Sequence, residues 1–241
     1  SLGQYQKAIE FYQQSLTITR EIGDRNGEGS VLGNLGNAYY SLGQYQKAIE
    51  FFQQSLTIAR AIGSRNIEGG ALNNLGLAYN SLGQYQKAIE FYQQSLTIVR
   101  EIGSRHGEGS VLNNLGSAYR NLGQYQKAIE FFQQSLTIKR EIGDRNGEGN
   151  ALNNLGNAYY SLGQYQKAIE FCQQSLTIVR EIGDRNVEGS ALNNLGNAYD
   201  SLGQYQKAIE FFQQSLTIKR EIGDRYGEGG ALNNLGNAYY S

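Results

Sequence analysis

The sequence contains no proline, no methionine and no tryptophan, and only one cysteine and one histidine among its 241 residues. A single thiol, Cys172, cannot form an internal disulfide, which excludes a disulfide-stapled secreted fold. Cys172 and His106 give no metal site, because neither type has a second ligand of its kind. No apolar run approaches the roughly 18 residues that span a bilayer, and no signal peptide opens the chain. We therefore expect no metal, no cofactor, no membrane partner and a cytoplasmic location.

An excess of one charge is also missing. Lysine and arginine total 21, aspartate and glutamate total 22, and the net charge is -1. Such a balance gives no electrostatic footprint for nucleic acid, so no nucleic-acid partner is expected. His106 lies near a predicted helix start where other repeats have Asn or Tyr, and Cys172 takes the place of an apolar ring. With no nucleophile–base pair and no paired carboxylates, an enzyme is not expected.

What the sequence does have is a period of 40 residues, since its length equals six times 40 plus one. The first repeat reads SLGQYQKAIEFYQQSLTITREIGDRNGEGSVLGNLGNAYY, and the other five differ from it at only a dozen or so places. Repeats of this length are typical of solenoids, in which each repeat packs only against its neighbours.

Each repeat contains two predicted helices. The first runs from about Gln4 to Ile22 and stops at Gly23, which suits the left-handed residue after a helix end. Two apolar stripes at helical spacing indicate that this helix is covered on two sides. The first stripe comprises Tyr5, Ala8, Ile9, Tyr12 and Leu16, and the second comprises Phe11, Ile18 and Ile22.

The second predicted helix runs from about Arg25 to Ser41. Asp24 is suited to capping its start, and Ser64 and Ser104 are expected to cap equally well at the same place. Gly36 lies inside this helix in every repeat, so a backbone or a bulky ring is expected to pack against it, with Tyr45 or Tyr12 as partners. Arg25 is expected to form ordinary surface pairs with Glu21 and with Glu28. The apolar face is Val31, Leu32, Leu35, Ala38 and Tyr39.

One set of residues resembles the signature of the tetratricopeptide repeat family, and it recurs about six times along the whole chain. In one repeat the set is Leu32, Leu35, Gly36, Tyr39, Gly43, Tyr45, Ala48 and Phe52. Leu32 replaces the usual opening aromatic, Ser55 replaces a small alanine, the closing proline is absent, and the period is 40 residues rather than the usual 34 or so. This longer form resembles the repeats of Pins-type polarity scaffolds, kinesin light chains and cyanobacterial arrays.

The resemblance implies an all-α fold, a right-handed α-solenoid (superhelix) of antiparallel helix pairs with 12 helices. In the family's terms Arg25–Ser41 is a helix A, and Gln44–Ile62 is the helix B that follows it. The predicted organisation is a single solenoid over 1–241. It has an orphan helix B in 1–23, complete A–B pairs in 24–63, 64–103, 104–143, 144–183 and 184–223, and an orphan helix A in 224–241.

Repeats differ mainly on one face of helix A, opposite the packing residues Leu32, Leu35 and Tyr39. In the family that the chain resembles, this face lines a concave groove that holds peptides. Asparagine suits such a groove because its amide both donates and accepts hydrogen bonds. The predicted peptide-binding residues are Asn34, Asn37, Tyr40, Asn73, Asn74, Leu77, Asn80, Asn113, Asn114, Ser117, Arg120, Asn153, Asn154, Asn157, Tyr160, Asn193, Asn194, Asn197, Asp200, Asn233, Asn234, Asn237 and Tyr240.

Alternatives remain open for this face. The asparagines could instead satisfy the backbones of neighbouring helices inside the stack. Arg120 is its sole cation and the best candidate to meet a ligand carboxylate. The two-carboxylate clamp of chaperone-binding relatives is not expected, because the places that would hold Lys and Arg are mostly Asn, Ser and Gly. The preferred function is a protein–protein interaction scaffold that binds a peptide, and the alternative is a structural spacer.

A spacer of this kind could also assemble with itself. The first and last helices present apolar stripes that elsewhere in the chain meet each other, so end-to-end self-association into an open filament is predicted. The residues assigned to this contact are Tyr5, Ala8, Ile9, Tyr12, Leu232, Leu235 and Tyr239.

Overall fold

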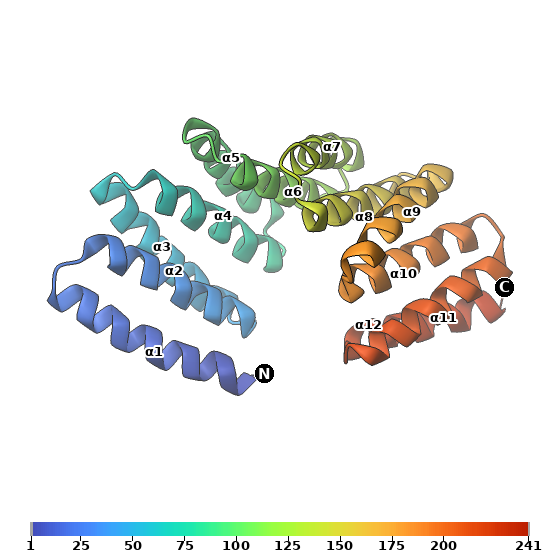
Figure 1. The fold of residues 1–241 in the computed structure, drawn as a ribbon, viewed down its shortest axis with the longest axis horizontal. Helices are drawn as coiled ribbons and strands as arrows, with labels where there is room; N and C mark the ends of the chain where they lie inside the picture. The colour runs from blue at the N-terminus through green and yellow to red at the C-terminus, as the bar shows by residue number, and fades with distance from the viewer. Residues whose placement is uncertain (1, 241) are drawn as a thin grey trace. The chain divides into compact units, whose positions relative to one another are not determined.

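The computed structural model describes residues 2–240, and within them the chain forms twelve α-helices and no strand (Figure 1). The helices are α1 (Leu2–Glu21), α2 (Arg25–Ser41), α3 (Tyr45–Ile62), α4 (Arg65–Ser81), α5 (Tyr85–Glu101), α6 (Arg105–Asn121), α7 (Tyr125–Glu141), α8 (Arg145–Ser161), α9 (Tyr165–Ile182), α10 (Arg185–Ser201), α11 (Tyr205–Glu221) and α12 (Arg225–Tyr240). Even-numbered helices are the predicted A helices, and odd-numbered helices are the B helices.

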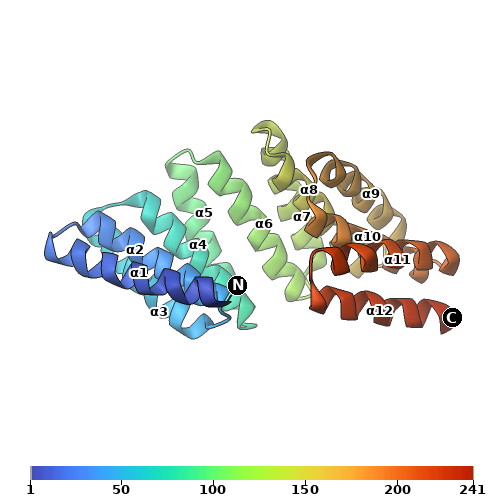
Figure 2. The same cartoon turned by 60° about the horizontal axis from the view of Figure 1, so that its bottom comes forward.

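The chain divides into two compact halves, residues 1–122 and residues 123–241, and each is described by itself. Within each half, successive helices pack as antiparallel neighbours (Figures 1 and 2). Ser1 and Ser241, the limits of the predicted single solenoid, lie outside the described residues, and its division into repeats stays a prediction. None of the helices in residues 2–240 combines the length and apolar character that crossing a bilayer requires.

The predicted signals of the turn between α1 and α2 are confirmed. The turn before α2 contains Gly23 with φ of 72°, a left-handed conformation that favours glycine. Gly27 N donates to Asp24 Oδ1 at 2.8 Å, so Asp24 caps the helix. Serine caps one of its two helices and not the other. Gly107 N donates to Ser104 Oγ at 3.3 Å, as predicted, whereas Ser64 makes no side-chain cap, so the prediction is wrong at Ser64.

The ring that packs against Gly36 belongs to Phe52 of the following B helix, and not to Tyr45 or Tyr12 as predicted. A Cβ at Gly36 would lie 2.5 Å from Phe52 Cδ1, so only glycine leaves room for the ring. Phe52 is fully buried together with Leu32 and Leu35. The same arrangement recurs with Gly76 under Tyr92 and with Gly196 under Phe212. These aromatic-on-glycine contacts hold helix A against the next helix B.

The second apolar stripe of each B helix packs differently. Phe51 stacks on Tyr39 with the ring centroids 5.2 Å apart, and Lys47 Nζ lies 5.3 Å from the centroid of the same ring. Stacked aromatic pairs and a cation over a ring both stabilise a half-exposed surface. Phe51 of this stripe is therefore covered by α2, whereas Ile62 at the end of the stripe is exposed, and α1 carries Phe11 exposed.

Cys172 occupies the ring position beneath which Gly156 lies, and its side chain is fully buried. Burial raises the pKa of the Cys172 thiol to about 12. Because the thiolate is the reactive form, a disulfide reagent at pH 8 should label the native chain at least about 100-fold more slowly than the unfolded chain. Absorbance from the released thiol measures both rates. Immediate labelling of the native protein would contradict this packing.

Candidate protein-interaction surface

The predicted peptide-binding residues share one face of the A helices, which we call the amide face. It comprises the positions of Gly33, Asn34, Asn37 and Tyr40 in every repeat. Asn37 and Asn237 are exposed, and Asn157 and Asn197 are half-buried. On the opposite face Leu35, Leu75 and Leu115 are fully buried, as expected for the packing side of helix A.

Asparagines of consecutive A helices bond to one another across this face in the N-terminal half. Asn74 Nδ2 donates to Asn37 Oδ1 at 3.1 Å. Asn114 Nδ2 donates to Asn73 Oδ1 at 2.9 Å. The amide face is therefore a ladder of side-chain amides that links one A helix to the next.

The C-terminal half has the same ladder. Asn194 Nδ2 donates to Asn153 Oδ1 at 3.0 Å. Asn234 Nδ2 lies 3.0 Å from Asn193 Oδ1 and 3.2 Å from Asn197 Oδ1. The alternative interpretation expected backbone partners for the invariant asparagines, but these contacts join side chains. A primary amide has two N–H donors and two acceptor lone pairs, so each ladder bond leaves spare hydrogen-bonding capacity.

A second row of contacts runs at the position of Tyr40. The hydroxyls of Tyr40 and Ser81 lie 2.8 Å apart in the N-terminal half, and Asn121 Nδ2 donates to Asn80 Oδ1 at 3.2 Å. The Ser201 hydroxyl donates to Tyr160 at 3.2 Å in the C-terminal half. This row adds half-buried aromatic and polar contact area along the edge of the ladder.

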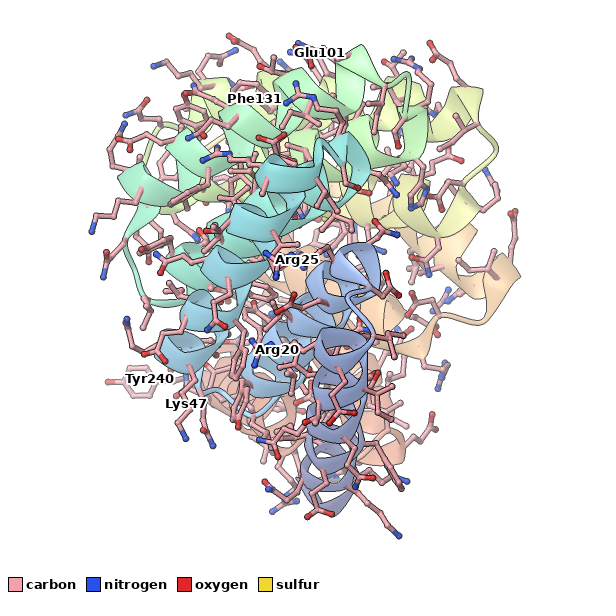
Figure 3. The ribbon with its side chains drawn as sticks, turned by 90° about the vertical axis from the view of Figure 1, so that its left-hand side faces the viewer. Arg20, Arg25, Lys47, Glu101, Phe131 and Tyr240 are labelled. Atoms are coloured by element: carbon pink, nitrogen blue, oxygen red, sulfur yellow. The ribbon has the colours of Figure 1, made fainter. Side chains whose placement is uncertain are left out.

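The remaining predicted residues occupy the same face. Tyr240 is exposed and projects from the molecule in Figure 3. Asn233 is exposed too, whereas Leu77, Ser117, Arg120 and Asp200 are half-buried. Among the described residues, the one buried side-chain oxygen or nitrogen without a hydrogen-bond partner is Asp200 Oδ1. Asn34 is exposed, and Asn154, the asparagine at the same position of a later repeat, is half-buried.

The amide face is hollowed where α1 and α2 meet. A hollow of about 250 Å³ is lined by Asn34 and Asn37 together with Tyr5, Ala8, Tyr12, Ala38 and Ser41. A larger hollow of about 600 Å³ is lined by residues of α9, α10 and α11 in the C-terminal half. Its charged residues already have partners, since Arg180 pairs with Glu188 at 2.8 Å and Glu181 pairs with Arg145 at 2.6 Å, so the larger hollow offers less unused chemistry.

The sequence reasoning missed the arginine clamps at the start of each A helix. Glu28 is only 3% exposed and accepts from Arg20 Nε at 2.8 Å and from Arg25 Nη1, so the predicted surface pair is in fact a buried carboxylate held by two guanidinium groups. The same clamp surrounds Glu68, Glu108, Glu148, Glu188 and Glu228. A glutamate that recurs in all six repeats next to two arginines was the available signal.

Two residues assigned to self-association are placed differently from the prediction. Ile9 and Leu235 are buried, because each faces the neighbouring helix of its own half and not outward. Tyr5, Leu232 and Tyr239 are exposed, and Ala8 and Tyr12 are half-buried. The outward-facing part of the predicted contact is thus smaller than the full apolar stripes.

Several known proteins are similar to this chain in sequence or in fold. Human G-protein-signaling modulator 1 is 50% identical over 34 residues, which make up 14% of this chain and 5% of that protein. A structure of kinesin light chain repeats from Podospora anserina has a TM-score of 0.66 at 25% identity, covering 80% of this chain and 95% of that chain. A Rap protein complexed with competence and sporulation factor has a TM-score of 0.72 at 16% identity, covering 99% of this chain and 71% of that chain.

The sequence pattern of one family matches most of the chain. Its description is tetratricopeptide repeat, and the matched segments are residues 1–61, 68–141 and 147–221. The matches contain the glycine that receives an aromatic ring, the buried leucines of helix A and the turns between helices. The fold of antiparallel helix pairs is also that of the solved kinesin light chain repeats. The chain therefore belongs to the tetratricopeptide repeat family.

Proposed function

We propose that the protein is an interaction scaffold that holds an extended peptide segment of a partner protein on the amide face. The observation that carries this proposal is the amide ladder. Its amides are half-exposed, fixed in place by one another, and each retains hydrogen-bonding capacity. The backbone of an extended peptide carries a donor and an acceptor on almost every residue, and it can pair with such a row whatever its side chains.

Fixing the amides in advance also lowers the entropy lost on binding. Side chains that are already ordered by Asn–Asn bonds need no further immobilisation when a peptide arrives. The hollow lined by Asn34 and Asn37 gives room for one peptide side chain on this face. Tyr40 and Tyr160 supply rigid amphipathic contact area, and Arg120 supplies a cation for an acidic peptide residue.

The test uses a peptide selected from a random display library on the whole chain, with its affinity then measured by calorimetry. Asn74→Ala with Asn114→Ala should weaken binding at least about 10-fold, because each lost hydrogen bond contributes roughly 1 kcal/mol. Gln53→Ala with Gln93→Ala removes two exposed amides from the B helices and should change affinity less than about twofold. A larger loss in the glutamine variant would overturn the proposal.

Self-association is a second candidate function, and one specific observation favours it. A Cβ at Gly236 would meet no atom within 4 Å, whereas the equivalent Gly196 receives the ring of Phe212. Tyr12 of α1 stands at the ring position of its repeat and is half-buried. A second copy could place Tyr12 over Gly236. Sedimentation of the 241-residue chain from micromolar to millimolar concentration should then show association that Tyr12→Ala abolishes, and a monomer throughout would exclude it.

A further inference from the structure

In α4, α8 and α10 the clamp arginine that begins the A helix reaches beyond its own buried glutamate. Arg65 donates through Nη1 to Glu68 at 2.7 Å and through Nη2 to Glu101, which lies at the end of the next B helix. In the C-terminal half Arg145 Nη2 donates to Glu181 at 2.6 Å, and Arg185 Nη2 donates to Glu221. A second carboxylate is therefore a regular ligand of this guanidinium group.

At the first such place the second carboxylate is missing. Ala61 stands where the other repeats have Glu101, Glu181 and Glu221. Among the described residues Arg25 has one ion-pair partner, Glu28, and its side chain is 54% exposed, against 43% for Arg65. Two guanidinium groups, Arg20 and Arg25, thus share one carboxylate, and Figure 3 shows both on the side that faces the viewer.

The predicted pair of Glu21 with Arg25 is wrong: Glu21 makes no ion pair among residues 2–240, so it does not supply the missing carboxylate. The arginine at the same position of a later repeat also avoids the glutamate that precedes it. Arg185 also has a glutamate four residues before it, Glu181, yet it takes Glu221, while Glu181 pairs with Arg145. The direction of the Nη2 donor therefore favours a carboxylate that arrives from the position of residue 61 rather than from the preceding turn.

We propose that Arg25, beside Ala61, is a docking point for a carboxylate carried by an acidic segment of a partner protein. The ligand class follows from the chain itself, because glutamate is what the same Nη2 donor binds in three other repeats. The planar fork of arginine matches a carboxylate. The site lies at the start of α2, about 22 Å along the helix from Tyr40, so it is separate from the amide face.

Solvent exposure sets the strength of this contact. Exposed arginine–carboxylate pairs contribute little each, and salt screens them. Arg25 is therefore expected to fix the register of an acidic partner rather than to supply most of the affinity. An isolated acidic probe should bind only in the millimolar range at low ionic strength.

The test follows the Nε–H resonances of Arg25 and Arg65 by NMR while a hexaglutamate peptide is added at low salt. In the unsubstituted chain the Arg25 signal should shift and saturate, and the Arg65 signal should not. Ala61→Glu fills the vacancy and should weaken the Arg25 response at least about fivefold, whereas the neutral Ala61→Gln should leave it unchanged. Glu101→Ala opens the same vacancy elsewhere and should make Arg65 respond.

Each outcome decides for or against the proposal. Equal responses of Arg25 and Arg65 in the unsubstituted chain, or an undiminished response in Ala61→Glu, would overturn it. A parallel titration with inorganic phosphate that shifts Arg25 while hexaglutamate does not would also overturn it, since the site would then select phosphate. The circular dichroism of each variant confirms that the helices persist. None of these readouts depends on whether the amide face binds a peptide.

Discussion

Replacing Gly196 by alanine should destabilise the chain by about 1–3 kcal/mol, although alanine is the better helix former. The new methyl group would lie 2.5 Å from Phe212 Cδ1, and the ring is fully buried and cannot move without separating α10 from α11. Denaturant unfolding followed by circular dichroism measures the change in free energy. The steric conflict must outweigh a gain in helix propensity of up to about 1 kcal/mol.

The chain contains its own control for this prediction. Gly236 stands at the same place in the last repeat, but no atom lies within 4 Å of a Cβ there. Gly236→Ala should therefore be neutral or stabilising by up to about 1 kcal/mol, since only helix propensity acts. If both substitutions changed stability in the same direction, the packing of the ring on Gly196 would not be the reason that glycine is needed.

Removing both arginines around Glu68 should have the largest effect. In Arg60→Met with Arg65→Met the carboxylate of Glu68 would remain buried without a cation, which typically costs about 3–5 kcal/mol. Adding Glu68→Met to the same variant should restore most of the stability, because well-packed apolar residues often replace a buried ion pair without loss. Unfolding free energies at pH 7 for the double and triple variants check both results.

The double variant, Arg60→Met with Arg65→Met, should also reverse the contribution of Glu68 to the pH dependence of the unfolding free energy. Burial acts to raise the pKa of Glu68, but the hydrogen bonds from Arg60 and Arg65 outweigh it and leave this pKa below its ordinary value. The stabilisation from Glu68 is therefore present above the ordinary pKa and is lost as the pH falls through the lower, folded-state value. Without the arginines, burial alone raises the pKa of Glu68 above its ordinary value, so protonation as the pH falls through that raised value should stabilise the double variant. A double variant that lost stability in parallel with the unsubstituted chain would contradict the clamp.

Local signals were enough to predict the helices. The capping Asp24 and the left-handed Gly43 bracket α2, so Arg25–Ser41 was predicted with the bounds that the structure gives. The contacts of Gly36 were not, because several aromatics lie within reach along the sequence and only the packing of α2 on α3 selects Phe52. The burial of Glu28 was missed for a related reason. Its second partner, Arg20, lies on the preceding helix.

For the candidate site, too, the sequence predicted which residues share a face but not which of them bond to one another. The pattern of one helix was enough to place Asn34, Asn37 and Tyr40 on a common face. The bonds between asparagines join residues 37 or 41 positions apart, such as Asn74 with Asn37 and Asn114 with Asn73, and they depend on how one repeat stacks on the next. Stacking geometry is set by the whole helix interface and not by any local pattern, so these partners come from the structure alone.

The most direct test of the peptide-binding proposal observes the ladder amides themselves. The side-chain NH₂ signals of Asn74 and Asn114 should shift in NMR spectra when a display-selected peptide saturates the chain, because their spare donors and acceptors then meet the peptide backbone. Gln53 and Gln93, exposed on the B helices, serve as internal controls and should stay unchanged. Shifts confined to the glutamines, with the asparagine signals unmoved at saturation, would contradict the account.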